Sequence, residues 1–335
     1  MSPNASDPGD GRWTHDDLPA MDGETVVVTG ANSGLGLEAT RAFARVGARV
    51  VMACRSTERG HVARADVEQE GVAGELEVRE LDLADLDSVR AFADGVDAPV
   101  DALCNNAGVM AIPRSETADG FETQFGVNHL GHFALTGLLL DRLAAADGEA
   151  RVVTQSSGLH EDGEMEFDDL QGERDYDKWD AYARSKLANV LFGYELDRRL
   201  RGAGVDDVTS VVCHPGYAAT NLQLRGPEAE GSRLRVLAMK AANTAFAQSP
   251  ERGVLPMLYA ATSPALDGGE YVGPGGFRNM RGYPAVQESS PASHDEGDAR
   301  RLWGVSEDLT GVTYDFTAAR EARADGASGS AAAGD

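Results

Sequence analysis

Lysine is scarce in this 335-residue sequence, and acidic residues greatly outnumber basic ones. Lys178, Lys186 and Lys240 are the only lysines among 30 basic residues, 55 residues are acidic, and the formal net charge is −25. Because nucleic-acid binding needs a basic surface that engages phosphates, we expect no nucleic-acid partner. Acid excess with few lysines is typical of proteins that work in concentrated salt, where charges are screened over roughly 3 Å at 1 M. We therefore expect a halophilic cytoplasm as the setting.

Long apolar runs are also missing. No segment approaches the roughly 20 apolar residues that a bilayer crossing needs, so no membrane span is expected. The first twenty residues are acidic and contain neither a basic leader nor an apolar stretch, so we expect no secretion signal. The three cysteines, Cys54, Cys104 and Cys213, fall in apolar segments and fit the reducing environment of a cytoplasmic protein.

The order of the predicted elements indicates one α/β domain. Strand and helix patterns alternate from Thr25 to about Tyr271, which predicts a Rossmann-type doubly wound parallel sheet of about seven strands with helices on both faces. We expect an N-terminal extension at 1–20, the α/β domain at 21–285 with a lid at about 221–248, and a C-terminal extension at 286–335 whose last 15 residues, roughly, are disordered. Strands are expected near 25–29, 48–54, 75–81, 100–104, 150–156, 207–213 and 270–272.

A glycine-rich turn follows the first predicted strand. Its sequence is Gly30-Ala-Asn-Ser-Gly34-Leu-Gly36, and a helical pattern comes directly after it. In this context glycines let the backbone approach a pyrophosphate, and the helix N-terminus offers unpaired N–H groups. The turn therefore predicts dinucleotide binding, with a tight turn that binds nothing as the alternative.

Arg55 follows the second predicted strand, where no acid is present. In dinucleotide folds an acid at this place favours a free ribose 2′-hydroxyl, whereas an arginine favours a 2′-phosphate. We expect NADP(H) to be preferred, with NAD(H) also accepted. The alternative is an ordinary solvated arginine.

Tyr182 and Lys186 stand four residues apart in a segment with a helical pattern. Residues at this spacing lie on the same face of a helix. A neighbouring ammonium favours a phenolate, so Lys186 is expected to lower the pKa of Tyr182 from its ordinary value of about 10. The pair alone is also what two exposed helix residues would give.

The motifs stand in a characteristic order across roughly residues 22 to 275. They are Thr29-Gly30-Ala-Asn-Ser-Gly34-Leu-Gly36, Leu81-Asp82-Leu83, Asn105-Asn106-Ala107-Gly108, Asn128, Ser156-Ser157, Tyr182-Ala-Arg-Ser-Lys186 and His214-Pro215-Gly216 followed by Thr220. This set resembles the classical short-chain dehydrogenase/reductase family. The long gap between Ser157 and Tyr182, and the run from Tyr182 to Phe192, resemble its retinol-dehydrogenase-like branch.

The resemblance implies a catalytic tetrad of Asn128, Ser157, Tyr182 and Lys186. Tyr182 would be the general acid and base, Ser157 would orient the reacting oxygen, Lys186 would also bind the nicotinamide ribose, and Asn128 would hold a water. The cofactor contacts that it implies are Gly30, Asn32, Ser33, Gly34, Leu35, Gly36, Arg55, Asp82, Leu83, Asn106, Ala107, Gly108, Tyr182, Lys186, Pro215, Gly216 and Thr220.

Each of these residues also has a structural interpretation. Ser156 competes with Ser157 for the role beside Tyr182, Asp82 could cap a helix, and Asn128 could bond only backbone. His129, His132 and His214 lack metal-ligand partners at suitable spacing and are expected to be packed or surface residues.

Two segments could cover the active site. Residues 158–181 hold ten acids and form either a flap or a solvated excursion. The apolar residues of 221–248 suggest a small lipophilic carbonyl or alcohol, although they could equally pack the lid onto the core. We expect an oxidoreductase, with a catalytically silent NADP(H)-binding sensor or scaffold as the alternative and a sugar-nucleotide epimerase disfavoured. A homodimer or homotetramer is expected from the family.

Overall fold

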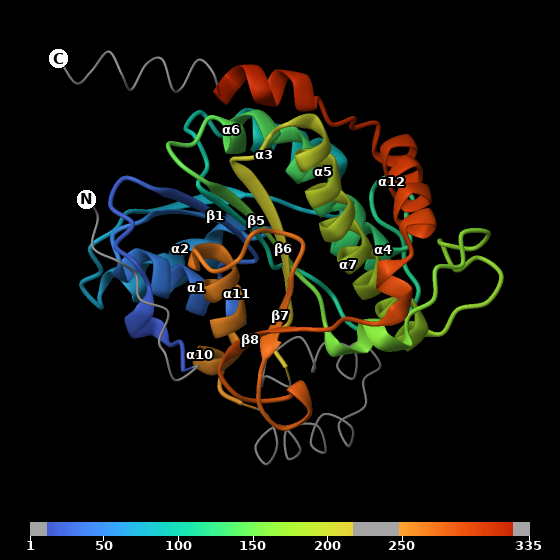
Figure 1. Cartoon of the computed structure of the whole chain (residues 1–335), viewed down its shortest axis with the longest axis horizontal. Coiled ribbons are helices and arrows are strands. Elements are labelled where there is room, and N and C mark those ends of the chain that lie inside the picture. The colour runs from blue at the N-terminus through green and yellow to red at the C-terminus, as the bar shows by residue number, and fades with distance from the viewer. Residues whose placement is uncertain (1–11, 217–247, 324–335) are drawn as a thin grey trace.

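The protein is built around a single eight-stranded sheet (Figure 1). Its computed structural model describes residues 12–216 and 248–323. The strand order is β3-β2-β1-β4-β5-β6-β7-β8, and the first seven strands along this order run parallel. The predicted doubly wound parallel sheet is confirmed. The strands are β1 (Thr25–Thr29), β2 (Arg49–Cys54), β3 (Leu76–Glu80), β4 (Ala102–Asn105), β5 (Ala150–Gln155), β6 (Val208–Cys213), β7 (Tyr271–Pro274) and β8 (Pro284–Gln287).

Strand β8 corrects the predicted count of seven. It pairs antiparallel with β7, with Val272 opposite Val286, and forms the edge of the sheet. The strand is four residues long and begins at Pro284, a place where proline is tolerated because an edge strand need not donate every N–H. So short a segment has little periodicity, and its pairing depends on β7 being in place. The boundary predicted at residue 285 falls inside this strand.

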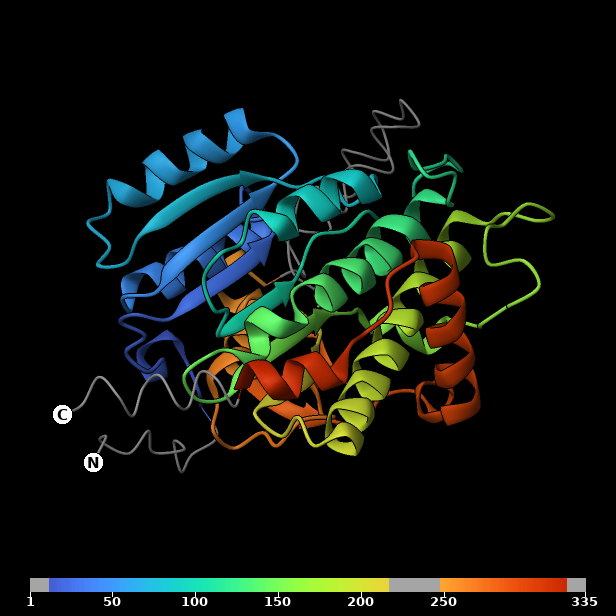
Figure 2. The same ribbon diagram turned by 90° about the horizontal axis from the view of Figure 1, so that it is seen from above.

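Helices cover both faces of the sheet, as Figure 2 shows from above. On one face, α1 and α11 pack against the strands, and on the other face α3, α5 and α7 do so. The helices are α1 (Gly34–Arg45), α2 (Thr57–Glu68), α3 (Leu86–Asp94), α4 (Thr123–Phe125), α5 (Gly131–Leu138), α6 (Leu140–Ala144), α7 (Lys178–Ala203), α10 (Pro250–Gly253), α11 (Leu255–Thr262) and α12 (Glu296–Thr310).

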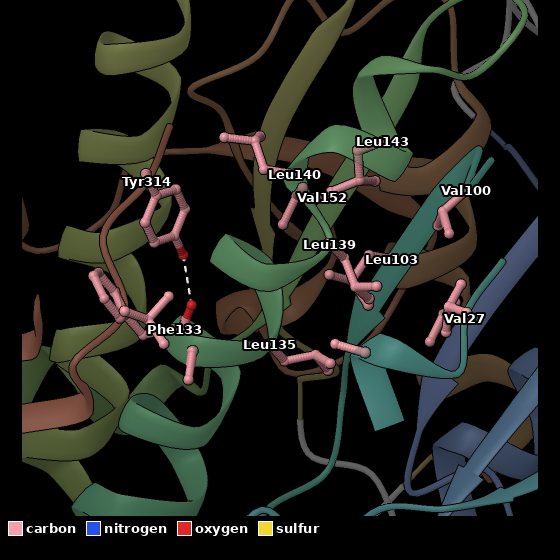
Figure 3. Close-up of a cluster of buried hydrophobic side chains, with 14 of the residues drawn as sticks. Val27, Val100, Leu103, Phe133, Leu135, Leu139, Leu140, Leu143, Val152 and Tyr314 are labelled. Atoms are coloured by element: carbon pink, nitrogen blue, oxygen red, sulfur yellow. Dashed lines mark hydrogen bonds between the residues drawn. The ribbon is translucent and has the colours of Figure 1, made fainter. Parts of the chain in front are cut away.

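The core on the α5 side of the sheet combines residues from distant parts of the chain (Figure 3). Val27, Leu103 and Val152 come from three neighbouring strands, and Phe133 comes from α5. The Tyr314 hydroxyl donates to the Phe133 carbonyl at 2.7 Å, so the chain after α12 is tied to this core. Each large apolar side chain buried in this way contributes roughly 1.5–3 kcal/mol to stability.

Helix α12 packs along α7 and brings Trp303 into the same core. The Trp303 ring meets Phe133 edge-on at 5.1 Å between centroids and lies 4.6 Å from the Tyr314 ring. The residues predicted as a C-terminal extension therefore contribute buried aromatic side chains to the domain. The predicted disorder of the last residues concerns positions outside the described ones.

The sheet order reverses between β1 and β4, because β2 and β3 lie on one side of β1 and the later strands lie on the other. At such a reversal the loops that leave the two strands separate and open a crevice at their carboxyl ends. The glycine turn after β1 and the Asn106 turn after β4 both lie there.

Candidate active site

A cavity of about 760 Å³ opens at the carboxyl ends of the parallel strands. It brings together most of the residues predicted from the sequence. Gly36 and Asn128 lie behind its wall, and Thr220 lies outside the described residues, as do residues 221–247 of the predicted lid. The predicted residues that line the cavity are Gly30, Asn32, Ser33, Gly34, Leu35, Arg55, Asp82, Leu83, Asn106, Ala107, Gly108, Ser157, Tyr182, Lys186, Pro215 and Gly216.

The glycine turn has a backbone that only glycine adopts easily. Gly30 and Gly34 have φ of +68° and +56°, in the left-handed region. A Cβ on Gly36 would lie 2.4 Å from the Gly30 carbonyl oxygen and 2.7 Å from Asn106 Nδ2, so helix and strand approach too closely for a side chain. Ser33 is the N-cap of α1, yet its side chain makes no capping hydrogen bond. The helix therefore presents N–H groups to the cavity.

The turn after β4 is fastened to the end of β1. The Thr29 hydroxyl accepts from the backbone N–H groups of Asn106 and Ala107, both at 2.9 Å. The Asn106 side chain donates to the Thr29 carbonyl at 2.7 Å. His132 contacts the same hydroxyl through Nε2 at 2.9 Å and is buried, so this histidine belongs to the packing of the turn.

The chain that follows β2 brings two arginines to the cavity. Arg55 was predicted there, and Arg59 lines the same wall from the first turn of α2. The sequence prediction did not include Arg59, although a second arginine shortly after Arg55 is a local signal that could have suggested it. Asp82 also lines the cavity, and its carboxylate accepts from the Ala84 N–H at 3.0 Å. The N-cap of α3 is Asp85, so Asp82 does not cap that helix.

Tyr182 and Lys186 lie on α7, which begins after the capping carboxylate of Asp177 and ends at Gly204. Both side chains are buried, with 4% and 3% of their surface exposed. Lys186 Nζ lies 5.8 Å from the centre of the Tyr182 ring and donates to the Gln155 carbonyl at 3.1 Å. The predicted placement of the pair on one helix face beside the nucleotide crevice therefore agrees with the geometry.

Burial, and not Lys186, dominates the acidity of Tyr182. Desolvation raises the pKa of Tyr182 to about 12, and a hydrogen bond with Ser157 acts in the opposite direction. The net pKa of Tyr182 is therefore raised, and not lowered as the spacing of Tyr182 and Lys186 predicted, because desolvation outweighs the contacts that favour the phenolate. Desolvation also lowers the pKa of Lys186 to about 8. As a result, the Lys186 ammonium loses its proton more easily than usual, and the Tyr182 phenol ionises less easily than usual.

The two adjacent serines after β5 have different surroundings. The Ser156 hydroxyl is buried and donates to the Lys186 carbonyl at 2.8 Å. The Ser157 hydroxyl lies close enough to Tyr182 to act against the rise of its pKa, and it accepts from the Leu159 N–H at 3.2 Å. Ser157 therefore has the geometry of a partner for the reacting oxygen, and Ser156 fixes α7 to the strand end.

Asn128 lies in a π-helical turn, Gly126–Leu130, between α4 and α5. Its side chain accepts from the Val109 N–H at 2.8 Å and donates to the Val109 carbonyl and to the Ser185 hydroxyl, both at 2.9 Å. The side chain therefore joins the loop after β4 to α7 through Val109 and Ser185.

The other histidines and the cysteines have structural surroundings. His129 packs between Phe125 and Phe192 and contacts the Ser306 hydroxyl at 2.8 Å. Among residues 12–216 and 248–323, no group of three histidine, cysteine or acidic side chains is arranged to hold a metal ion. The three free cysteines are buried.

The acidic segment 158–181 is attached to α7 by Arg184, which donates to the carbonyls of Glu164 and Asp169. Leu159, Glu161 and Trp179 from this segment line the cavity. Trp179 remains 41% exposed, so it stands at the rim.

None of the helices in the described ranges has the length and apolar character needed to cross a bilayer.

These features fit a nicotinamide dinucleotide. The left-handed glycines and the uncapped α1 N-terminus suit a pyrophosphate, and a side chain at Gly36 would destroy that cradle. At the other end of the cavity a phenol, a hydroxyl and an ammonium converge. The fold and this site define a dinucleotide-dependent oxidoreductase.

The comparison with family models agrees with this class. The model of the short chain dehydrogenase matches residues 24–230, and the chain belongs to this family. It is 42% identical to mouse retinol dehydrogenase 14 over 307 residues, which cover 87% of each chain. It is 40% identical to human retinol dehydrogenase 12 over 300 residues, which cover 88% of this chain and 89% of the relative. The predicted retinol-dehydrogenase-like character is confirmed.

Solved structures show the same architecture. An uncharacterized protein from Mycobacterium paratuberculosis is 44% identical, with a TM-score of 0.75 over 91% of this chain and 99% of the other. A gluconate 5-dehydrogenase from Beutenbergia cavernae, solved with bound NADP, is 27% identical, with a TM-score of 0.56 over 75% of this chain and 95% of the other.

Proposed function

We propose that this protein is an NADP-dependent oxidoreductase that interconverts an alcohol and a carbonyl with Tyr182 as general acid and base. The observation that carries the proposal is the convergence of Tyr182, Ser157 and Lys186 in the cavity that the glycine turn opens. Relatives named retinol dehydrogenases support alcohol and carbonyl chemistry.

The proton steps follow from the side chains. The Tyr182 hydroxyl gives its proton to the carbonyl oxygen during reduction and receives it during oxidation. Ser157, whose hydroxyl lies beside Tyr182, would hold the same oxygen in place. Lys186, with a pKa of about 8, is mainly an ammonium near pH 7, where it would stabilise a developing phenolate and could hold the ribose hydroxyls of the cofactor. The nicotinamide supplies or accepts the hydride when bound.

A water path to Lys186 would use the Asn128 backbone. The Asn128 side chain contacts Val109 and Ser185, and its backbone carbonyl oxygen lies 3.0 Å from His132 Nδ1. A carbonyl oxygen can accept more than one hydrogen bond, so we propose that a water joins this oxygen to Lys186.

Arg55 and Arg59 support a preference for NADP(H). Both line the adenosine end of the cavity, where a 2′-phosphate would carry about two negative charges. Changing Arg55 to alanine should raise the Michaelis constant for NADP(H) much more than that for NAD(H). An unchanged ratio of the two constants would remove Arg55 from cofactor selection.

The cavity wall supports a lipophilic substrate. Apolar side chains from the loop after β4, the π-helical turn, the turn after β5 and the β7–β8 connection line it, namely Val109, Met110, Val127, Leu159 and Met280. Oxidation of NADPH should be followed in concentrated salt against aldehydes, ketones and quinones. Turnover of one carbonyl class would support the enzyme, whereas tight NADPH binding without turnover of any would favour the sensor or scaffold.

Changing Tyr182 to phenylalanine tests the assigned role directly. Removing a general acid lowers rates by about 10² to 10⁴-fold, so kcat should fall by that factor while the Kd for NADPH stays nearly constant. A variant that kept most of its rate would contradict the mechanism.

We also infer an acidic surface adapted to concentrated salt inside a cytoplasm, and assembly of the chain into dimers or tetramers. The net charge of −25 is the basis for the first inference. Added potassium chloride should raise Tm because it screens repulsion among the acids. A flat dependence of Tm on salt would contradict it, and light scattering in the same buffers would give the oligomeric state.

A further inference from the structure

His160 lies three residues after Ser157, in the 3-10 turn Gly158–Asp162. Only 1% of its surface is exposed, although Glu161 and Asp162 beside it are exposed. Its Nδ1 lies 2.8 Å from the Ser157 carbonyl oxygen, and its Nε2 lies 3.0 Å from the backbone nitrogen of Ser290. The ring therefore bridges the turn that follows β5 and the segment that follows β8.

These two contacts determine the proton position on the ring. The Ser290 backbone N–H can only donate, so Nε2 must accept it with a lone pair. The Ser157 carbonyl can only accept, so Nδ1 must carry the hydrogen. A doubly protonated imidazole would direct an N–H at the Ser290 N–H. In agreement with this, burial lowers the pKa of His160 from its ordinary value.

A stack of rings supports the same carbonyl. The Tyr271 hydroxyl donates to the Ser157 carbonyl at 3.4 Å and lies 3.2 Å from His160 Nδ1. The Tyr271 ring stacks on His214 with 7° between the planes and 5.1 Å between centroids. His214 in turn contacts Gln287 of β8 at 2.9 Å. Tyr271, His214 and Gln287 line the cavity, so this group forms its wall beside Ser157.

We propose that His160, held as the Nδ1–H tautomer by the Ser290 N–H, is a positioning residue that donates to the Ser157 carbonyl and thereby sets the direction of the Ser157 hydroxyl toward Tyr182. The inference rests on the proposed function, because that function gives the Ser157 hydroxyl its task. His160 does not reach the cavity lining itself and acts through the backbone of Ser157.

Three variants separate the two hydrogen bonds. His160→Asn places an amide N–H near the position of Nδ1 and keeps the bond to Ser157, while it is too short to reach Ser290. His160→Gln places a carbonyl near the position of Nε2 and keeps the bond to Ser290 only. His160→Phe keeps the ring volume and loses both bonds.

Steady-state kinetics with NADPH and the best carbonyl of the panel should rank these variants. His160→Asn should keep most of the wild-type kcat, whereas His160→Gln and His160→Phe should lose about 10- to 100-fold in kcat, the size of effect that a misplaced catalytic group produces. The KM for the carbonyl and the Kd for NADPH should change little in all three. A fast Gln variant beside a slow Asn variant, or three variants with the wild-type kcat, would overturn the inference.

The tautomer gives a readout that does not depend on turnover. Nitrogen NMR of the full chain labelled with ¹⁵N-histidine should show one ring with a protonated Nδ1 and an unprotonated Nε2 whose signals disappear in His160→Phe. The opposite tautomer would overturn the inference even if the enzyme is active or the variants unfold. Failure of the wild type to reduce any carbonyl would instead refute the proposed function and leave the tautomer measurable.

Discussion

The two ends of the cavity are built in different ways. At the end where we propose that the pyrophosphate binds, the site is formed by the backbone. Gly30 and Gly34 are in the left-handed region, and no side chain caps the N-terminus of α1. At the other end, where we propose acid–base chemistry, the polar atoms belong to the side chains of Ser157, Tyr182 and Lys186, which reach the cavity from two separate elements.

This difference has an energetic consequence. The glycine turn relieves crowding between α1 and the end of β1, so it supports folding and cofactor binding together. The acid–base end buries an ammonium and a phenol, whose pKa values are shifted to about 8 and about 12 by desolvation. Burying a charge opposes folding unless partners compensate. Substitutions at the first end should therefore damage stability and function together, and those at the second end should separate them.

The neighbouring serines test the acid–base end most strongly. Ser157→Ala removes the hydroxyl beside Tyr182, and loss of one such donor to a reacting oxygen lowers kcat by about 10²- to 10³-fold. Ser156→Ala removes the bond to the Lys186 carbonyl and should mainly reduce the free energy of unfolding, by about 1 kcal/mol.

The pair is a matched control, since both substitutions delete one hydroxyl at adjacent positions. Kinetics and urea unfolding of both variants should place the kinetic loss in Ser157→Ala and the stability loss in Ser156→Ala. Equal effects on kcat would contradict the separate roles of these serines.

Lys186→Met should make the protein more stable and inactive. Below the folded-state pKa of about 8 the ammonium is charged in both states, and the folded state bears the full penalty of burying it. From there up to the unfolded value near 10.4, the unfolded chain binds more protons, so wild-type stability rises with pH. The gain in the free energy of unfolding from Lys186→Met should be about 3 kcal/mol near pH 7, since each unit of pKa difference corresponds to about 1.4 kcal/mol. Between the folded and unfolded pKa values the gain should shrink by about 1.4 kcal/mol for each pH unit.

The Gln155 carbonyl, which loses the Lys186 donor in this variant, still receives Asn189 Nδ2 at 3.0 Å. No buried acceptor is therefore left without a partner. Urea unfolding at several pH values between about 7 and 9.5 would measure the difference while Tyr182 stays protonated in both proteins. A variant less stable than wild type near pH 7 would show that the ammonium contributes more contacts than its desolvation removes.

What could be predicted from the sequence depended on local information. The strand before Gly30, the glycine turn and the helix face shared by Tyr182 and Lys186 all follow from spacing within a few residues. Strand β8 was missed because it exists only through pairing with β7, and the role of Trp303 was missed because its partners Phe133 and Phe192 lie far away in sequence.

The pKa shifts of Tyr182 and Lys186 could not be predicted from the sequence, because they too depend on residues that are distant along the chain. The spacing of Tyr182 and Lys186 places a charge near a phenol, but it does not give the number of atoms that exclude water from both. Desolvation comes from the whole surrounding fold, and it reverses the expected direction of the pKa shift on Tyr182. Arg59, by contrast, could have been found, because its position relative to Arg55 is a local feature.

Gly36→Ala sharpens the comparison from the pyrophosphate end. The added Cβ would lie 2.4 Å from the Gly30 carbonyl oxygen, and both atoms are held by backbone, so the turn must move. Crowding of this kind lowers the free energy of unfolding by about 1–3 kcal/mol, and the displaced turn should also weaken NADPH binding. Gly202→Ala is the control, since no neighbouring atom lies within 4 Å of its Cβ and alanine favours a helix by up to about 1 kcal/mol. If Gly36→Ala bound NADPH as tightly as Gly202→Ala, as measured by calorimetric titration, the close approach of α1 to β1 would have no part in holding the cofactor.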